Sequence, residues 1–388
     1  MLKNLLLILL GLVLGLLVVE VGLRALANQL PDSLRYRAGL ARFLANTDGI
    51  YLPDPDLWHK GAPDIDRVIS GHPDYTYHVQ TNSLGYQGIG FRDDGFAGQP
   101  FAIAIGDSYT WGDGVDNNSS WVEQLETRTG LDIVNLGVSG YGSIQRLRVF
   151  QKYGLPLKPK LILWSFFPND FYDDGHFIWR EETGRLAKQG RPQPEPDWPE
   201  KLDKSLRRFL VSYDWLMIPF TEPEDEEEWE RLVYTDRTLD LTFVLRPYWE
   251  KRLDLSNEYV ARGQRLTEQA LLEVQTSADQ TGAVLVVIYF PFKEQTYWPI
   301  VSTLVDNPPA HDVNWPENWL KTWCEAHKIA YLDLSSVFEE RASQGEQLFF
   351  RYDAHWNEAA HTLATQTIQQ YLQDAGLIPA SVAGEKAN

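Results

Sequence analysis

The stretch "AIGDSYTW", residues 104–111, follows directly on a short apolar run that begins at Phe101. A short run of this kind that ends at a glycine is typical of a buried strand followed by a tight turn. Ser108 stands on that turn. Its hydroxyl either attacks an acyl carbon or caps the helix that follows, and the stretch taken alone leaves both interpretations open.

The run at Phe101 is the first of five similar runs, each rich in β-branched or aromatic residues, with helical stretches between them. This alternation predicts an α/β fold with one parallel sheet covered by helices on both faces. The expected strands are 101–105, 132–138, 161–167, 284–290 and 329–335, and the expected helices are 120–128, 143–152, 257–281 and 315–327.

Composition limits the function classes. The chain has 388 residues, of which 44% are hydrophobic, so one enlarged domain with a sizeable core is expected. The formal net charge of -19 disfavours nucleic acid as a partner, because the field repels phosphates. Cys324 is the only cysteine, which excludes an intrachain disulfide and a cysteine-based metal cluster. A flavodoxin-like nucleotide binder lacks support, since neither GxGxxG nor a GK[ST] loop follows the first strand, and no cofactor is expected.

The chain divides into three regions by composition. Residues 1–27 form an N-terminal transmembrane anchor or signal segment, residues 28–100 an irregular lead-in packed on the main domain, and residues 101–380 the main domain. Within the main domain, residues 171–255 interrupt the strand-helix alternation with proline-rich and acidic stretches, which predicts an inserted region beside the active face.

The N-terminal segment is uncharged from Leu5 to Val19, which is short for a membrane span of roughly 20 residues. The span lengthens to Leu23 if Glu20 lies at the level of the lipid headgroups. The "ALA" at 25–27 resembles a signal-peptidase site, whereas Glu20 and Arg24 favour a retained anchor. The flanking charges do not decide the orientation, because Lys3 on one side is opposed by Arg24, Arg35, Arg37 and Arg42 on the other; a body outside the cytoplasm is the favoured interpretation.

Three consecutive strand ends carry groups suited to acyl transfer. They are Ser108 after the first strand, Gly140 after the second and Asn169 after the third. Ligands of an open parallel sheet bind beyond the carboxyl ends of its strands, so these residues are expected to meet. Ser108 would be the nucleophile. The backbone N–H groups of Ser108 and Gly140 and the side chain of Asn169 would form the oxyanion hole.

The general base is expected in "YDAHWNEAAH", residues 352–361. Asp353 and His355 are two residues apart and face the same way in an extended segment, so Asp353 can orient the imidazole that takes the Ser108 proton. A metal site is the rival interpretation, because Glu358 and His361 add two further ligand types. The spacing of six between the histidines does not fit a helical zinc pair, so no metal is expected and His361 is predicted to be structural.

Four blocks resemble the SGNH (GDSL-type) serine hydrolase superfamily, from about Phe101 to the end of the chain. They are "GDSYTWGDGV" with Ser108, "NLGVSGYG" with Gly140, "FPND" with Asn169 and "DAHW" with Asp353 and His355. The resemblance implies a flavodoxin-like three-layer sandwich and a Ser-His-Asp triad. The stretch "TNSLGYQG", residues 81–88, is similar to the lead-in of membrane-anchored bacterial members.

The sequence departs from the superfamily pattern at two points. Phe167 and Pro168 precede Asn169, where the superfamily usually has glycine two residues before the asparagine. Asp353 precedes His355 by two residues rather than three, which resembles the group of alginate and cell-wall polysaccharide O-acetylation (alginate acetyltransferase-like) proteins. That resemblance implies an acylated glycan substrate and a protein at the periplasmic face of the bacterial inner membrane, or a secreted one if the N-terminus is cleaved.

The sequence therefore predicts a serine esterase or acyltransferase acting on ester-linked acyl groups, with O-acetyl on a carbohydrate favoured. Hydrolysis and transfer share one acyl-enzyme and are not separated. The other class is a catalytically silent carbohydrate-binding or scaffold subunit of a polysaccharide-modifying complex. Tryptophans in the insertion either stack on sugars or, as the favoured interpretation, pack in its core; they include Trp179, Trp198, Trp215 and Trp229.

Overall fold

The structure is a computed structural model that describes residues 2–26, 32–186, 198–217, 231–306 and 312–379. The chain divides into two compact units. The first contains Met1–Gly49, Val68–Tyr77 and Pro194–Glu226, and the second contains Ile50–Arg67, His78–Gln193 and Glu227–Asn388.

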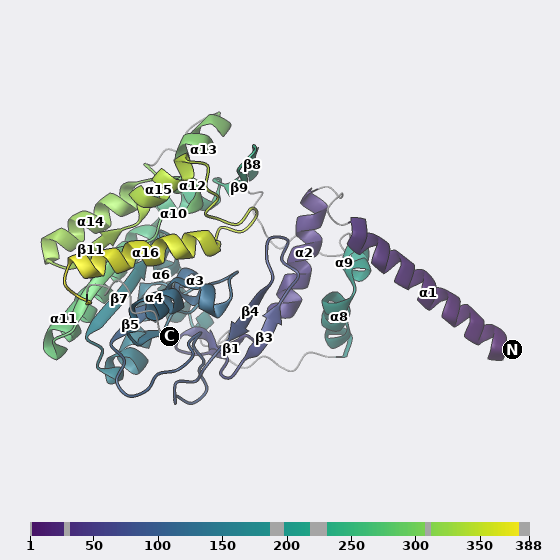
Figure 1. Ribbon diagram of the computed structural model, residues 1–388, viewed down its shortest axis with the longest axis horizontal. Helices are drawn as coiled ribbons and strands as arrows, with labels where there is room; N and C mark the ends of the chain where they lie inside the picture. Colours follow the sequence, from purple (N-terminus) through teal and green to yellow (C-terminus); the bar gives the residue numbers. More distant parts are fainter. Residues whose placement is uncertain (1, 27–31, 187–197, 218–230, 307–311, 380–388) are drawn as a thin grey trace, which may run out of the picture. The chain divides into compact units, whose positions relative to one another are not determined.

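The second unit is built on a five-stranded parallel sheet (Figure 1). Its strands lie in the order β11-β10-β7-β5-β6. The second strand in sequence, β6, therefore lies on one side of β5, and the later strands β7, β10 and β11 follow on the other side. This is the flavodoxin-like order, and its switch point lies between β5 and β7. The strands are β5 (Ala102–Ile105), β6 (Ile133–Asn135), β7 (Leu161–Phe166), β10 (Val284–Tyr289) and β11 (Ala330–Asp333).

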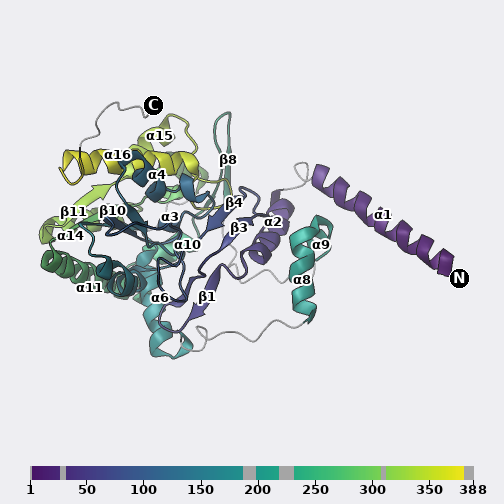
Figure 2. The same cartoon turned by 60° about the horizontal axis from the view of Figure 1, so that its bottom comes forward.

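Helices cover both faces of this sheet (Figures 1 and 2). Ala102 and Ala104 of β5 share a core with α4 (Trp121–Thr129) and α16 (Glu358–Asp374). Ile103 and Ile105 share the opposite core with helices α5 (Ser143–Val149), α6 (Asp170–Glu182), α11 (Glu258–Thr281) and α14 (Trp315–His327). The predicted α/β three-layer sandwich is thereby confirmed, and each predicted strand and helix overlaps an observed one.

The lead-in is more regular than the sequence indicated. It contains helix α2 and two pairs of short strands, of which β1 and β2 are antiparallel. Strands of four residues are too short to show a period, so their pattern could not be recognised in the sequence. These elements are α2 (Asp32–Thr47), β1 (Tyr51–Asp54), β2 (Trp58–Gly61), β3 (Asp66–Ile69) and β4 (Tyr77–Gln80).

The predicted insertion contributes to both units. Helices α8 (Trp198–Phe209) and α9 (Val211–Met217) belong to the first unit, whereas the antiparallel pair β8 (Arg231–Thr235) and β9 (Asp240–Val244) belongs to the second. Helix α10 (Tyr248–Leu253) follows in the second unit. The acidic run 222–230 and the tail 381–388 lie outside the described residues.

Shorter helices complete the second unit. Helix α3 (Ser108–Trp111) follows β5, α12 (Lys293–Thr296) and α13 (Trp298–Leu304) follow β10, and α15 (Ser335–Ser343) follows β11. A π-helical turn, Phe150–Gly154, and a 3-10 turn, Leu155–Leu157, extend α5, and a second 3-10 turn, Asn117–Ser119, precedes α4.

The first unit begins with the apolar helix α1 (Leu2–Leu26). Residues Leu6–Leu26 are long and apolar enough to cross a membrane, by length and composition. Their leucine and valine side chains are largely exposed, as expected of a segment that does not pack in a protein core. The helix continues past Glu20, so it has the longer of the two lengths considered from the sequence.

Candidate active site

Ser108 lies at the start of α3, directly after the turn that ends β5. The turn requires Gly106, because an added Cβ would lie 2.0 Å from the Ser165 hydroxyl oxygen. Asp107 is the N-cap of α3 and accepts a 3.0 Å hydrogen bond from the Tyr109 N–H. Since Asp107 caps the helix, the Ser108 hydroxyl is available to another partner.

That partner is His355. Its Nε2 lies 2.7 Å from Ser108 Oγ, and its Nδ1 lies 2.5 Å from Asp353 Oδ1. The same carboxylate oxygen also accepts the His355 backbone N–H at 2.8 Å. The structure thus joins a hydroxyl, an imidazole and a carboxylate in one chain of hydrogen bonds, although Ser108 and His355 are distant in sequence. This is the order of groups by which a serine is activated for attack.

The charges around His355 favour its protonated form. Burial by itself lowers the pKa of His355, but Asp353 raises it most strongly in the other direction, with further contributions from Asp113 and Asp107, and the result is a pKa of about 9. Asp113 is held in place by the Ser139 hydroxyl, which donates to it at 2.7 Å. The surrounding carboxylates therefore stabilise the imidazolium form of His355.

Gly140 lies in the loop after β6 with a φ of +76°, in the left-handed region that favours glycine. His59 of β2 packs against this loop, and its Nε2 lies 2.8 Å from the Ser139 carbonyl oxygen. In a trans peptide the C=O and the N–H point in opposite directions. A hydrogen bond from His59 to that carbonyl therefore fixes the direction of the Gly140 N–H, away from His59.

Asn169 is the N-cap residue of α6, just beyond β7. Its Oδ1 is buried and has no hydrogen-bond partner among the described residues. The unusual Phe167 before it fills space beside the nucleophile turn, since its ring lies 4.4 Å from that of Tyr109 and 5.8 Å from that of Trp249. The Phe167 carbonyl accepts the Asp170 N–H at 2.9 Å, which closes the turn that carries Asn169.

Arg146 joins two of these turns and was not singled out from the sequence. Its buried guanidinium bonds both carboxylate oxygens of Asp170, at 2.6 and 2.7 Å, and lies 3.1 Å from Asp107 Oδ2. It also donates to the Ser165 carbonyl at 2.8 Å. One cation therefore ties the residue before Ser108 to the residue after Asn169.

Tyr109 connects the turn that carries Ser108 to the segment that carries Asp353 and His355. Its hydroxyl donates to the Ala354 carbonyl at 2.9 Å, between Asp353 and His355. Its ring lies 5.1 Å from the rings of both His355 and Trp356. The backbone that carries Asp353 and His355 is thus fixed relative to Ser108.

The rival metal ligands point elsewhere. His361 Nδ1 accepts a 3.2 Å hydrogen bond from the Trp121 N–H at the start of α4. Burial, with help from Arg92 and His355, lowers the pKa of His361 to about 3, so the ring stays neutral and suits this acceptor role. His355 bonds Ser108 and Asp353 instead.

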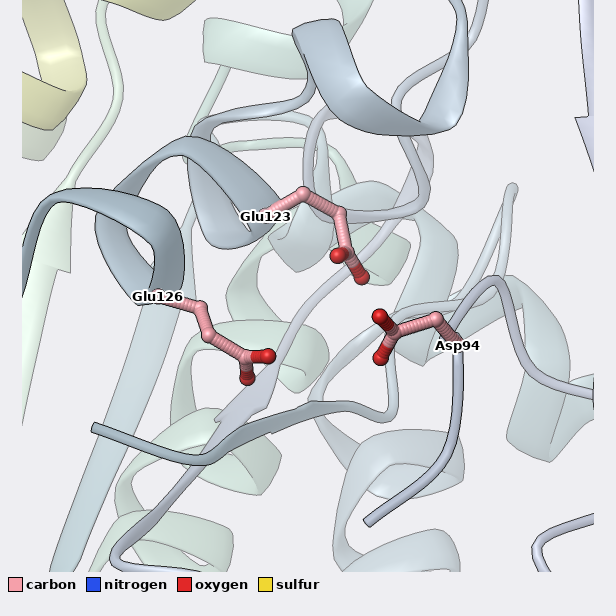
Figure 3. Close-up of side chains that lie close together, drawn as sticks. All are labelled: Asp94, Glu123 and Glu126. Carbon is pink, nitrogen blue, oxygen red and sulfur yellow. The ribbon is translucent and has the colours of Figure 1, made fainter. Parts of the chain in front are cut away.

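A group of carboxylates near α4 was not anticipated from the sequence. Glu123 and Glu126 on α4 and Asp94 on a loop point toward one another, with ligand oxygens within 4.8 Å (Figure 3). Beside them is a cavity of about 560 Å³, whose lining includes Asp66, Asp94 and Glu123. Burial, followed by Asp93 and the other acids, raises the pKa of Glu123 to about 9. Burial and the neighbouring carboxylates thus favour the protonated form of Glu123, which reduces the repulsion within this group.

Comparison with known families identifies the domain. The family model described as "SGNH hydrolase-like domain, acetyltransferase AlgX" matches residues 250–387. The chain carries an SGNH hydrolase-like domain. Asp353 and His355 lie within the matched segment, and Ser108 lies before it. The description of that family names a hydrolase-like domain and an acetyltransferase, so the matched segment is of an ester-hydrolase or acetyltransferase type.

Solved structures resemble the chain only weakly. An acetylxylan esterase from Geobacillus stearothermophilus, solved as a catalytic mutant, is 11% identical with a TM-score of 0.36, covering 74% of this chain and 99% of that chain. The acetyl xylan esterase AlAXEase is 9% identical with a TM-score of 0.39, covering 70% and 99%. An α/β hydrolase from the metagenome of Lake Arreo is 14% identical with a TM-score of 0.38, covering 74% and 99%. No curated protein matches the chain.

Proposed function

We propose that the protein cleaves or transfers ester-linked acetyl groups on a carbohydrate through an acyl-enzyme on Ser108. The observation that supports this most strongly is the hydrogen-bond chain from Ser108 through His355 to Asp353. The family match, whose description names an acetyltransferase, supports acetyl as the acyl group.

In the proposed mechanism, His355 Nε2 takes the Ser108 proton as Oγ attacks the acyl carbon. The oxyanion is held by the N–H groups of Ser108 and Gly140 and by the Asn169 amide. His355 then gives its proton to the leaving alcohol. Water or a sugar hydroxyl attacks the acyl-enzyme, again with His355 as base, and Asp353 keeps the imidazole oriented throughout.

A carbohydrate substrate is supported mainly by the Asp353–His355 spacing and the family match. The tryptophans of the insertion add little support for a carbohydrate substrate. Trp179 is half-buried and stacks on His176 at 5.4 Å, and Trp198 belongs to the first unit. The side chain of Trp215 and all of Trp229 lie outside the described residues.

The proposed location is a membrane surface, with α1 as a retained anchor and the catalytic unit outside the cytoplasm, at the periplasmic face of a bacterial inner membrane. The length and apolar composition of α1 support the membrane anchor. A silent carbohydrate-binding or scaffold subunit remains the alternative class. The complete hydrogen-bond chain on Ser108 favours the enzyme over that alternative.

The function is tested with 4-nitrophenyl acetate as donor, in the presence and absence of xylo-oligosaccharide or oligomannuronate acceptors. We expect the full chain in detergent to release nitrophenol. Mass spectrometry then assigns the acetyl group to free acetate for a hydrolase or to the oligosaccharide for a transferase. Binding of oligosaccharide with no release of nitrophenol would overturn the proposal in favour of a binding subunit.

The pH dependence follows from His355. Since the imidazole must be neutral to accept the Ser108 proton and its pKa is about 9, kcat/KM should rise about tenfold per pH unit below that value and level off above it. Asp113→Asn keeps the acceptor for Ser139 but removes a negative charge, so the rising limb should move toward neutral pH. Asp279→Asn, an exposed change on α11, should leave the limb in place. If the rising limb stays at the same pH in Asp113→Asn, Asp113 does not raise the pKa of His355, which would contradict this assignment.

Asn169→Ala tests the oxyanion hole. Loss of one such donor typically lowers kcat by about 10²–10³-fold, because the bond strengthens as charge develops in the transition state. KM for 4-nitrophenyl acetate should change far less. Asn318→Ala, on the distant helix α14, serves as control. An unchanged kcat in Asn169→Ala would remove Asn169 from the proposed site.

A further inference from the structure

The C-terminal end of α1 is hydrogen-bonded to the junction between α8 and α9. Glu20 is 9% exposed, and its carboxylate accepts the backbone N–H groups of Val211 at 2.9 Å and Ser212 at 2.8 Å. These are the first residues of α9, so Glu20 satisfies N–H groups that the helix itself leaves unpaired. Arg24 pairs with Glu20 at 2.6 Å and donates to the Phe209 carbonyl at 2.8 Å. Figures 1 and 2 show α9 beside this end of α1.

Helix α8 turns polar side chains toward its own unit. Lys204 pairs with Asp48 just beyond α2 at 3.2 Å. Asp203 accepts from Arg207 on α8 at 2.8 Å and from the Tyr213 hydroxyl on α9 at 2.8 Å. The contacts between α8 and its neighbours α2 and α9 therefore include ion pairs and hydrogen bonds.

Three apolar side chains of α8 are exposed on the surface of the unit. Trp198 is 75% exposed, Leu202 47% and Phe209 71%. On a helix with 3.6 residues per turn, these three positions fall within about 40° of one another. Leu216 of α9 is 65% exposed as well. A helix that pairs its polar side inward and exposes Trp, Leu and Phe has the opposite arrangement to a helix on a water-facing surface.

We propose that α8 and α9 form an interfacial element that lies on the bilayer crossed by α1, with Trp198, Leu202 and Phe209 inserted among the lipids. This inference rests on α1 being a membrane anchor. A lipid surface is the partner because Glu20 and Arg24 bond the α8–α9 junction to the end of the apolar span, where headgroups begin. Tryptophan, phenylalanine and leucine are the side chains that interfacial helices insert, about 5–10 Å deep. The part of the insertion in the first unit thus serves membrane binding.

The test uses the full chain in phosphatidylcholine–phosphatidylglycerol vesicles, with NBD attached to single introduced cysteines and quenched by lipids that carry doxyl groups on their acyl chains. The probe positions are Leu202→Cys and Phe209→Cys. Val13→Cys on α1 reports the anchor itself, and Leu272→Cys on α11 is the matched control, because Leu272 is 42% exposed. The native Cys324 is buried and its pKa is raised to about 12, so its thiol stays unlabelled at neutral pH.

We expect quenching of about twofold or more at positions 13, 202 and 209, and little at position 272. Quenching at 13 without quenching at 202 and 209 would overturn the interfacial element and leave the anchor intact. Equal quenching at 202 and 272 would also overturn it, since that result indicates unspecific adsorption. No quenching at 13 would refute the anchor, and the inference would fail with it.

Discussion

Ser108→Ala will lower turnover of 4-nitrophenyl acetate by about 10⁴-fold or more, because the covalent step has no other nucleophile beside His355 in the proposed mechanism. The measurement is initial-rate kinetics on the full chain, together with thermal unfolding. Little change in unfolding is expected, since the helix cap at this turn is Asp107 rather than Ser108. Ser302→Ala, at an exposed position on α13, should leave the rate unchanged. A Ser108→Ala rate within tenfold of the original would exclude Ser108 as the nucleophile.

Arg146→Met will destabilise the second unit by about 3–5 kcal/mol, the usual effect of removing one partner of a buried ion pair. Asp170 would lose both of its charge-assisted hydrogen bonds, and Asp107 would lose its 3.1 Å ion pair. Both carboxylates are almost fully buried, so water cannot replace the guanidinium. Urea denaturation measures the loss, and kcat at a temperature where the variant is folded should also fall, because the Ser108 and Asn169 turns are no longer tied together.

Two comparisons make the Arg146 prediction specific. Arg148→Met, on the same helix, removes a half-exposed pair with Glu181 and should cost about 1 kcal/mol or less. Asp170→Asn added to Arg146→Met should recover part of the lost stability, because it removes a buried charge without a partner. If Arg146→Met costs no more than Arg148→Met, then Arg146 does not carry the role assigned to it.

The sheet could be predicted from the sequence because its strands are short, uninterrupted apolar runs. The strands β5 and β7 are buried at every residue, as expected when helices cover both faces. The lead-in could not be predicted in the same way. Its strands have four residues each, and Trp58 adopts a positive φ of 72° that no sequence period foretells. The division of the insertion between two units also depends on contacts distant in sequence, such as that of Glu20 with Val211.

The candidate site also contains residues that could be predicted from the sequence and residues that could not. Ser108, Asp353 and His355 were predictable because strand ends converge on one edge of a parallel sheet and their residue types belong to one chemistry. Arg146, Tyr109 and His59 could not be singled out, since an arginine, tyrosine or histidine usually faces solvent or packs in a core. Their roles arise from hydrogen bonds across the fold, to Asp170, Ala354 and Ser139 respectively.

The most direct measurement is the mass of the covalent adduct formed with a fluorophosphonate, followed by peptide mapping. A hydroxyl made nucleophilic by His355 should take up one phosphonyl group per chain, located on Ser108, and His355→Ala should slow its formation by several orders of magnitude. An adduct on another residue, or acetyl-ester turnover with Ser108 unmodified after saturating treatment, would contradict the proposed acyl-enzyme.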